Sequence, residues 1–265
     1  MKLGISLACL CLFLLSCKDS GNGPDAVDAG EFKADFKVGE KRLLLLEYAM
    51  QGKTYGFDLF NLAEIEIEKD TLFQGLTGKI VKSTLSQFLP ESTIVNEYRK
   101  MLVRNGDSLF TYHFTGDGLP SPFLFGLVKR AGYDSSVFND RTLDLVFPFA
   151  ADKPWQIRTP DDTSGALPLE KEWIGNDTVA FDGKRFRCDV FLMHSFVPVK
   201  SWIASVGLLK AEIDYGTSYF TDSLGTVVDS AENTERYELL EINPSPSAIA
   251  TAKEKYRAMT KEHMP

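Results

Sequence analysis

The chain is poor in the residues from which metal, disulfide and phosphate sites are built. Its 265 residues include three histidines and four cysteines. Neither His-Glu-x-x-His nor Cys-x-x-Cys, two ligand patterns of zinc sites, occurs. There is no glycine-rich phosphate loop, and Asp161-Asp162-Thr163 lacks the ligand spacing of a calcium loop. We therefore expect no metal site and no cofactor.

Positive charge and long apolar runs are also scarce. The 29 Lys and Arg residues are outnumbered by 37 Asp and Glu residues, which gives a net charge of −8. An acidic chain without a basic run is unsuited to nucleic acid and to electrostatic docking on anionic lipid. No segment after the N-terminus reaches the roughly 18 apolar residues of a spanning helix. The sequence therefore predicts no nucleic-acid partner and no membrane-spanning helix.

The N-terminus does carry one apolar run, over residues 1–16 (MKLGISLACLCLFLLS). It follows a single positive charge at Lys2 and is too short for a permanent spanning helix, which indicates a signal peptide. Its end, Leu14 to Cys17 (LLSC), resembles the lipobox of bacterial lipoproteins. That resemblance implies cleavage before Cys17 and a lipid on its thiol. The alternative is an ordinary secretory signal followed by a chance cysteine.

A lipid on Cys17 implies a place in the cell envelope, with the membrane as a partner through that lipid alone. Lys18 stands where enteric lipoproteins retained on the inner membrane have Asp, so the resemblance favours the outer membrane, on its periplasmic or surface face. Cys188 would then be the last free cysteine, and the folded part could form no internal disulfide.

Four segments follow from composition and periodicity. After the signal peptide (1–16), residues 17–35 are rich in Gly, Asp, Ser and Ala and predict a lipidated flexible tether. Residues 36–243 predict a β-rich globular domain, and 244–265 a C-terminal helix or tail, with an apolar helical stripe from Ser247 to His263.

Strands of period 2 dominate the globular part. In Ala63 to Glu68, for example, Ile65 and Ile67 alternate with glutamates, which predicts a strand with one wet face. Ala151 to Leu169, with little periodicity, predicts a long loop, and Gly207 inside Ser201 to Tyr215 predicts a bulge or bend.

Two hairpins have favourable turn residues. Asn105-Gly106 and Asp182-Gly183 both accept the positive φ angles of a type I′ turn. The first turn predicts that Arg104 faces Asp107 and that Met101 faces Phe110. The second predicts one shared face for four residues, which are Phe186, Cys188, Val190 and Leu192. We therefore expect the Cys188 thiol to be buried and unreactive.

These patterns predict a mainly β fold, a single antiparallel curved sheet or half-barrel with one or two short helices; a β-sandwich is the alternative. Lys200 to Glu212 (KSWIASVGLLKAE), with Tyr237 to Leu240 after it, resembles a strand pattern of β-rich envelope lipoproteins. Such proteins are often similar to the half-barrel of outer-membrane lipoprotein carriers. This chain departs from the pattern at Ser205, where glycine is usual.

Residues 106–109 spell GDSL, the signature of an esterase family whose serine ends a strand and begins a helix. Here Ser108 is followed by LFTYHF, which predicts a strand, and no histidine has an aspartate three residues before it. A hairpin turn explains these four residues better. A hydrolase that uses Ser108 stays an alternative.

Leu119 to Val128 concentrates apolar residues after two prolines. Its Phe123, Phe125 and Leu127 belong either to the core or to the lining of a site for a hydrophobic small molecule. The sequence predicts a non-enzymatic envelope lipoprotein, a binding or accessory module for an apolar ligand. The alternatives are the hydrolase and a structural subunit of an envelope complex, with another envelope protein as partner.

Overall fold

The computed structural model describes residues 27–54, 56–73, 75–115, 141–151, 153–158, 169–194 and 197–263. Its strands are β1 (Val27–Asp28), β2 (Lys41–Gly52), β3 (Gly56–Phe73), β4 (Leu76–Phe88), β5 (Thr93–Asn105), β6 (Ser108–Thr115), β7 (Arg141–Val146), β8 (Trp155–Arg158), β9 (Leu169–Phe181), β10 (Lys184–His194), β11 (Val199–Ala204), β12 (Gly207–Thr221) and β13 (Val227–Ile242). Helix α1 (Pro246–His263) follows β13. All strands belong to a single sheet, which confirms the mainly β prediction; the β-sandwich alternative is wrong.

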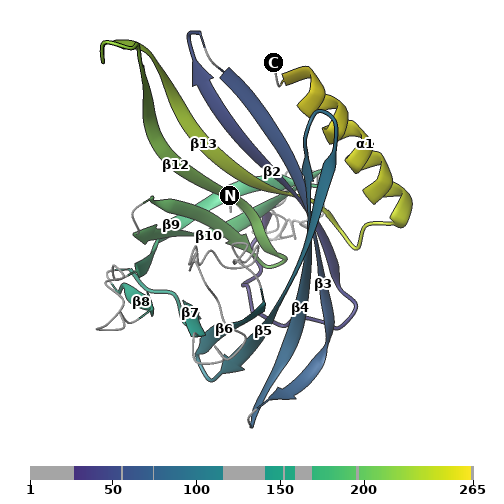
Figure 1. The fold of residues 1–265 in the computed structure, drawn as a ribbon. Helices are drawn as coiled ribbons and strands as arrows, with labels where there is room; N and C mark the ends of the chain where they lie inside the picture. Colours follow the sequence, from purple (N-terminus) through teal and green to yellow (C-terminus); the bar gives the residue numbers. More distant parts are fainter. Residues whose placement is uncertain are drawn as a thin grey trace, which may run out of the picture.

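The sheet is antiparallel, except where β1 pairs in parallel with β10, and it curls until its edges meet. The strand order runs from β7 through β2 and β13 to β8, so β7 and β8 are the two edges. Figure 1 shows these edge strands side by side below β9. Between them, the Trp155 indole N–H donates a 3.2 Å hydrogen bond to the Leu143 carbonyl. The sheet is therefore nearly closed around its apolar interior.

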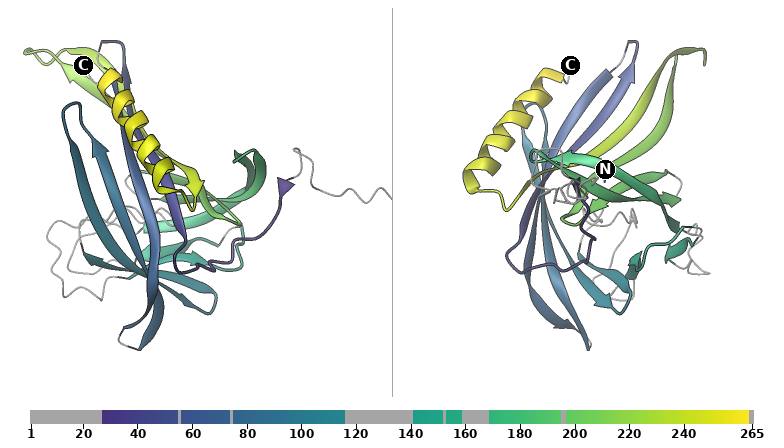
Figure 2. Two further views of the ribbon diagram at one scale, coloured as in Figure 1. Left: turned by 90° about the vertical axis from the view of Figure 1, so that its right-hand side faces the viewer. Right: turned by 180° about the vertical axis from the view of Figure 1, so that it is seen from behind.

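Strand β2 is buried on both faces, which explains its run of four leucines. Leu44 and Leu46 pack into the main core on the concave face. Leu43 and Leu45 pack on the convex face, in a smaller cluster with Tyr256 of α1. Figures 1 and 2 show α1 along this outer side of the sheet. A strand covered on both sides loses the alternation of polar and apolar residues.

Helix α1 confirms the helix predicted from Ser247 to His263, and its first turn has the expected chemistry. The Ser245 hydroxyl accepts a 3.1 Å hydrogen bond from the Ala248 backbone N–H, as an N-cap residue does. Pro246 then occupies the first helical position, where its missing N–H costs nothing. In the described part of the chain, no helix is long and apolar enough to cross a membrane.

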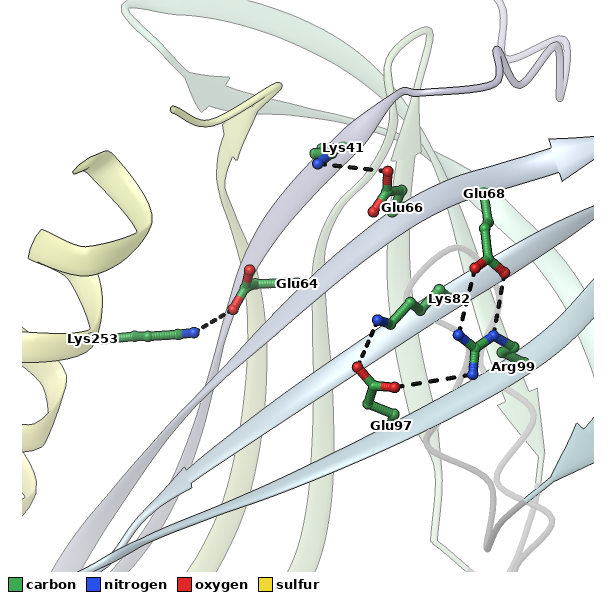
Figure 3. Close-up of polar contacts among 8 residues, drawn as sticks. All are labelled: Lys41, Glu64, Glu66, Glu68, Lys82, Glu97, Arg99 and Lys253. Carbon is green, nitrogen blue, oxygen red and sulfur yellow. Dashed lines mark hydrogen bonds and ion pairs between the residues drawn. The ribbon is translucent and has the colours of Figure 1, made fainter. Parts of the chain in front are cut away.

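The predicted wet face of β3 is also confirmed. Ile65 and Ile67 are buried in the core, whereas the glutamates between them lie on the convex face. There they join ion pairs with β2, β5 and α1 (Figure 3), namely Lys41–Glu66 at 3.5 Å, Arg99–Glu68 at 3.2 Å and Lys253–Glu64 at 2.5 Å. Solvent-exposed pairs of this kind stabilise by about 0–1 kcal/mol each, so the part of the convex face that carries these glutamates is solvated.

The predicted β5–β6 register is wrong, whereas the β9–β10 turn is confirmed. Arg104 pairs with Leu109 and Met101 with Tyr112, so the turn residues are Gly106 and Asp107. Gly106 has φ 58° while Asp107 has no positive φ, as in a type II′ turn and unlike type I′. At the second turn, Asp182 and Gly183 have φ 50° and 69°, which is the type I′ pattern.

Burial on β10 differs from the predicted one-sided pattern. Phe186, Cys188 and Val190 are buried as expected, but Leu192 is only half-buried. Phe191 and Met193, on the opposite face, are buried as well and belong to the same core cluster. Burial raises the pKa of the Cys188 thiol to about 12, which confirms an unreactive cysteine.

Of two stretches expected to be irregular, one is ordered in part. Trp155–Arg158 of the predicted loop forms β8, which pairs with β9, while residues 159–168 lie outside the described part. Gly207, with φ 102°, is the first residue of β12 directly after the turn, and the β11–β12 register shifts nearby, between Trp202 and Ile203, in agreement with the predicted bulge or bend. Arg42 fills the space where a Cβ on Gly207 would lie, and donates a hydrogen bond to the Val206 carbonyl.

The tether prediction is wrong for residues 27–35. Val27 and Asp28 form β1, and the following segment inserts Phe32 and Ala34 into the core together with Phe36. The composition of 17–35 hid this because its single phenylalanine, Phe32, lies among polar neighbours. The signal peptide, Cys17 and residues 18–26 lie outside the described residues.

Candidate functional site

Ser108 does not have the setting that an esterase nucleophile needs. It is the first residue of β6, paired with Asn105 and Val146, and the chain continues as strand instead of turning into a helix. His194 is bonded to Glu172 at 2.7 Å and His263 to Asp58 at 3.0 Å, so neither of these histidines is bonded to Ser108. The predicted lining residues Phe123, Phe125 and Leu127 lie outside the described part of the chain.

The most unusual feature of the interior is a cluster of three buried charged residues, Lys100, Asp144 and Lys171. They are 5%, 2% and 1% exposed and come from β5, β7 and β9. Lys100 pairs with Val81 and Lys171 with Met193, both core residues on the concave face. Charged side chains are almost never this buried unless they are paired.

A β-bulge places Asp144 in this cluster. Leu109 pairs with Leu145 and Phe110 with Leu143, so Asp144 is the extra residue of β7. Bulges of this kind redirect a side chain. The Asp144 carboxylate accepts a hydrogen bond from the Thr111 hydroxyl, and the Thr142 hydroxyl donates to the Thr111 carbonyl; both threonines are buried.

Lys171 is less well satisfied than Asp144. Its ammonium group has no hydrogen-bond partner among the described residues. It lies 5.3 Å from the ring centroid of Phe191, where a cation–π interaction gives partial compensation. Asp144 attracts it electrostatically through the interior.

Burial shifts the pKa of all three groups toward the neutral form. It raises the pKa of Asp144, against the opposing effects of Lys171, Thr111 and Lys100. It lowers the pKa of Lys100 and lowers that of Lys171 to about 8, in both cases against the attraction of Asp144. Two ammonium groups thus share one carboxylate, and the interior has an excess of positive charge whenever both lysines are protonated.

A pocket of about 320 Å³ lies next to this cluster. Its apolar wall consists of Phe32 from the N-terminal segment, together with Phe147 and Phe149 from the loop after β7. The segment that was expected to be a free tether therefore forms part of the pocket. The volume is at the lower end of the range of small-molecule sites, about 300–1,000 Å³.

The opposite wall is a polar network on β9 and β10. Arg187 donates a 2.8 Å hydrogen bond to the Asn176 side-chain oxygen. Asn176 and Trp173 donate to the same Asp189 carboxylate oxygen, at 2.8 and 3.0 Å. These bonds fix the side chains, so the pocket has an aromatic wall facing a wall of oriented polar groups.

Pocket and cluster share one aromatic layer. The Phe149 ring, which lines the pocket, stands edge-on to Phe191 with centroids 4.8 Å apart. The Lys171 ammonium lies against that same Phe191 ring. Trp173, in the pocket, and Lys171 also lie two residues apart on the same face of β9.

None of the three residues of this cluster was predicted as a site residue from the sequence, although part of the signal was present. In β5, Lys100 stands between Tyr98 and Leu102 in the period-2 apolar series, and in β9 Lys171 precedes Trp173 by two residues. A lysine in phase with core residues predicts a buried ammonium. Asp144 was not predictable in this way because a bulge determines where it points.

No family model and no curated protein sequence matches the chain. Among solved structures, a protein from Parabacteroides distasonis provisionally described as a lipoprotein aligns over 78% of this chain and 95% of its own length, at 11% identity and a TM-score of 0.36. A protein from Bacteroides fragilis, provisionally described as exported and with a YmcC-like fold, aligns over 82% and 98%, at 11% identity and a TM-score of 0.32. A domain from Vibrio parahaemolyticus, provisionally described as an outer-membrane lipoprotein-sorting protein, aligns over 83% and 92%, at 7% identity and a TM-score of 0.19. At these scores the similarities carry no argument about this chain.

Proposed function

We propose that the chain is a non-enzymatic lipoprotein of the cell envelope, anchored to the outer membrane through Cys17, that holds an apolar or amphipathic small molecule. The ligand-binding part of this proposal rests on the pocket. Its aromatic wall offers apolar contact, and its Arg187–Asn176–Asp189 network offers fixed polar groups. Small-molecule sites combine these two elements, apolar contact surface and a few oriented polar groups.

The proposed anchor limits where this pocket would work. Residues 18–26 separate Cys17 from β1, and an extended chain spans at most about 3.3–3.6 Å per residue. The globule would stay within a few tens of ångströms of the bilayer, close to a source of amphipathic molecules. Phe123, Phe125 and Leu127 are proposed as further lining of the ligand site.

A binding assay with a fluorescent fatty-acid probe tests the ligand-binding proposal. We expect the mature protein to take up the probe and Phe149→Ala to bind it at least tenfold more weakly, because the substitution removes one of the three phenylalanine rings of the apolar wall. Phe57→Ala is the matched control, since Phe57 lies on β3 beside Tyr48, outside the pocket. Absence of uptake by the native protein, or equal affinity in Phe149→Ala, would contradict the proposal.

The same assay tests the proposed role of Leu119 to Val128. If Phe125 lines the site, Phe125→Ala should weaken probe binding with little change in melting temperature. If Phe125 is instead a core residue, the substitution should cost roughly 3–5 kcal/mol of unfolding free energy, as for other buried aromatics.

The anchor is tested by Cys17→Ser. The hydroxyl cannot form the thioether to diacylglycerol, so we expect uncleaved precursor and no incorporation of radiolabelled fatty acid. Cys188→Ser is the matched control and should be labelled like the native protein, because Cys188 is buried in the folded domain. Labelling that persists in Cys17→Ser would overturn the assignment.

A further inference from the structure

We propose that Lys171, assisted by Lys100, binds the anionic group of the ligand, a carboxylate or phosphate, while the apolar part occupies the pocket beside Phe147 and Phe149. This inference rests on the proposed function and adds the chemical class of the ligand. Three observations on the concave face support it: the unsatisfied Lys171 ammonium, the charge balance of the cluster, and its contact with the pocket wall.

The Lys171 ammonium is a donor without an acceptor. Its side chain is 1% exposed, and no hydrogen-bond acceptor reaches its Nζ from the described residues. An ammonium group has three N–H donors, and burying them unpaired is strongly unfavourable. A ligand oxygen would supply the acceptor that the described residues do not offer.

The charge balance favours an anion over a neutral ligand. Two lysines share one aspartate, whose carboxylate already accepts a hydrogen bond from Thr111, while Thr142 donates to the Thr111 carbonyl. Thr111 holds the Asp144 carboxylate in place on β7. When both lysines are protonated, one additional negative charge would neutralise the cluster and give Lys171 a directly hydrogen-bonded counter-ion.

Two aromatic side chains, Phe149 and Phe191, separate the pocket from the Lys171 ammonium. Phe149 belongs to the pocket wall and contacts Phe191 edge-on, and Phe191 carries the Lys171 ammonium near its ring. Phe191 is fully buried and fixed between strands, whereas Phe149 is half-buried on a loop. Rotation of Phe149 is therefore the movement that would admit the anionic group.

Calorimetric titration of the mature protein with three probes separates this inference from the proposed function. Dodecanoate and dodecanol share an alkyl chain and differ in charge, and inorganic phosphate has charge without a chain. We expect dodecanoate to bind at least tenfold more tightly than dodecanol. Equal affinities would overturn the anion site while leaving the apolar pocket standing. If phosphate binds and the two alkyl probes do not, the anion site stands but the ligand is not an amphiphile. If none of the three probes binds, both proposals are overturned.

Two lysine variants complete the test. Lys171→Met should lower dodecanoate affinity at least tenfold, to the level of dodecanol, and leave dodecanol binding unchanged. Lys82→Met is the matched control, because Lys82 lies on the convex face in a 2.6 Å ion pair with Glu97 (Figure 3). Loss of dodecanoate binding in both variants, or in neither, would contradict the assignment to Lys171.

Discussion

Asp144→Asn should lower the free energy of unfolding by about 3–5 kcal/mol, the range for breaking a buried ionic group by removing one partner. The amide has nearly the same shape, so no cavity forms. The loss arises because the Lys100 and Lys171 ammonium groups keep their burial and lose their only carboxylate in the cluster. Urea unfolding at pH 7 measures the difference.

Asp70→Asn is the matched control for that measurement. The Asp70 carboxylate forms a 2.6 Å ion pair with Lys79, but its side chain is 68% exposed. Surface pairs contribute about 0–1 kcal/mol, so Asp70→Asn should be close to neutral. If Asp144→Asn also lowers the free energy of unfolding by less than about 1 kcal/mol, Asp144 contributes no more than a surface carboxylate. That result would contradict the proposed stabilisation of the buried lysines.

Lys171→Met should act in the opposite direction and raise the free energy of unfolding at pH 7 by about 1–4 kcal/mol, as replacement of a buried ionic group by a well-packed apolar one often does. Methionine fills similar volume and contacts Phe191 without a donor to satisfy. The remaining Lys100 and Asp144 form a neutral pair. A buried lysine that lowers the free energy of unfolding is expected where the residue is needed for binding.

The pH dependence identifies the cause of that gain. The pKa of Lys171 is lowered to about 8 in the folded protein, from 10.5 for an ordinary lysine. Between these values the unfolded chain binds more protons than the folded one, so the stability of the native protein rises with pH. The rise should be on the order of 3 kcal/mol at about 1.36 kcal/mol per pKa unit, and Lys100 adds to it in the same direction.

In Lys171→Met this rise should be reduced to the contribution of Lys100, and the difference between variant and native protein should shrink toward zero above pH 10.5. Urea unfolding at pH 7, 9 and 10.5 measures both curves. A stability gain that is the same at all three values would show that packing, rather than the buried charge, is its origin.

Local sequence patterns were sufficient for the elements that depend on nearby residues. The glutamates that alternate with Ile65 and Ile67 determine one wet face of β3, and Ser245 and Pro246 determine where α1 begins. Asp182-Gly183 determines a turn because both residues adopt positive φ there. Each of these features is decided within a few residues of the chain.

Features decided by long-range pairing could not be obtained in this way. Asn105-Gly106 is compatible with two registers, and the pairing of β6 with β5 and β7 selects the one with Gly106 first in the turn. The same is true of Asp144, whose direction depends on the bulge opposite Leu109. Phe32 packs into a pocket built from β9, β10 and the loop after β7, elements that lie more than a hundred residues away in the sequence.

Titration of Lys171 itself tests most directly whether this residue is a buried ammonium that binds an anion. NMR of lysine-labelled protein, with the signal assigned by its absence in Lys171→Met, follows the side chain from pH 6 to 11. The account predicts a pKa of about 8 in the free protein, and a rise toward 10.5 when dodecanoate is bound, because a paired anion stabilises the charged form. A pKa near 10.5 without ligand, or one that dodecanoate leaves unchanged, would contradict it.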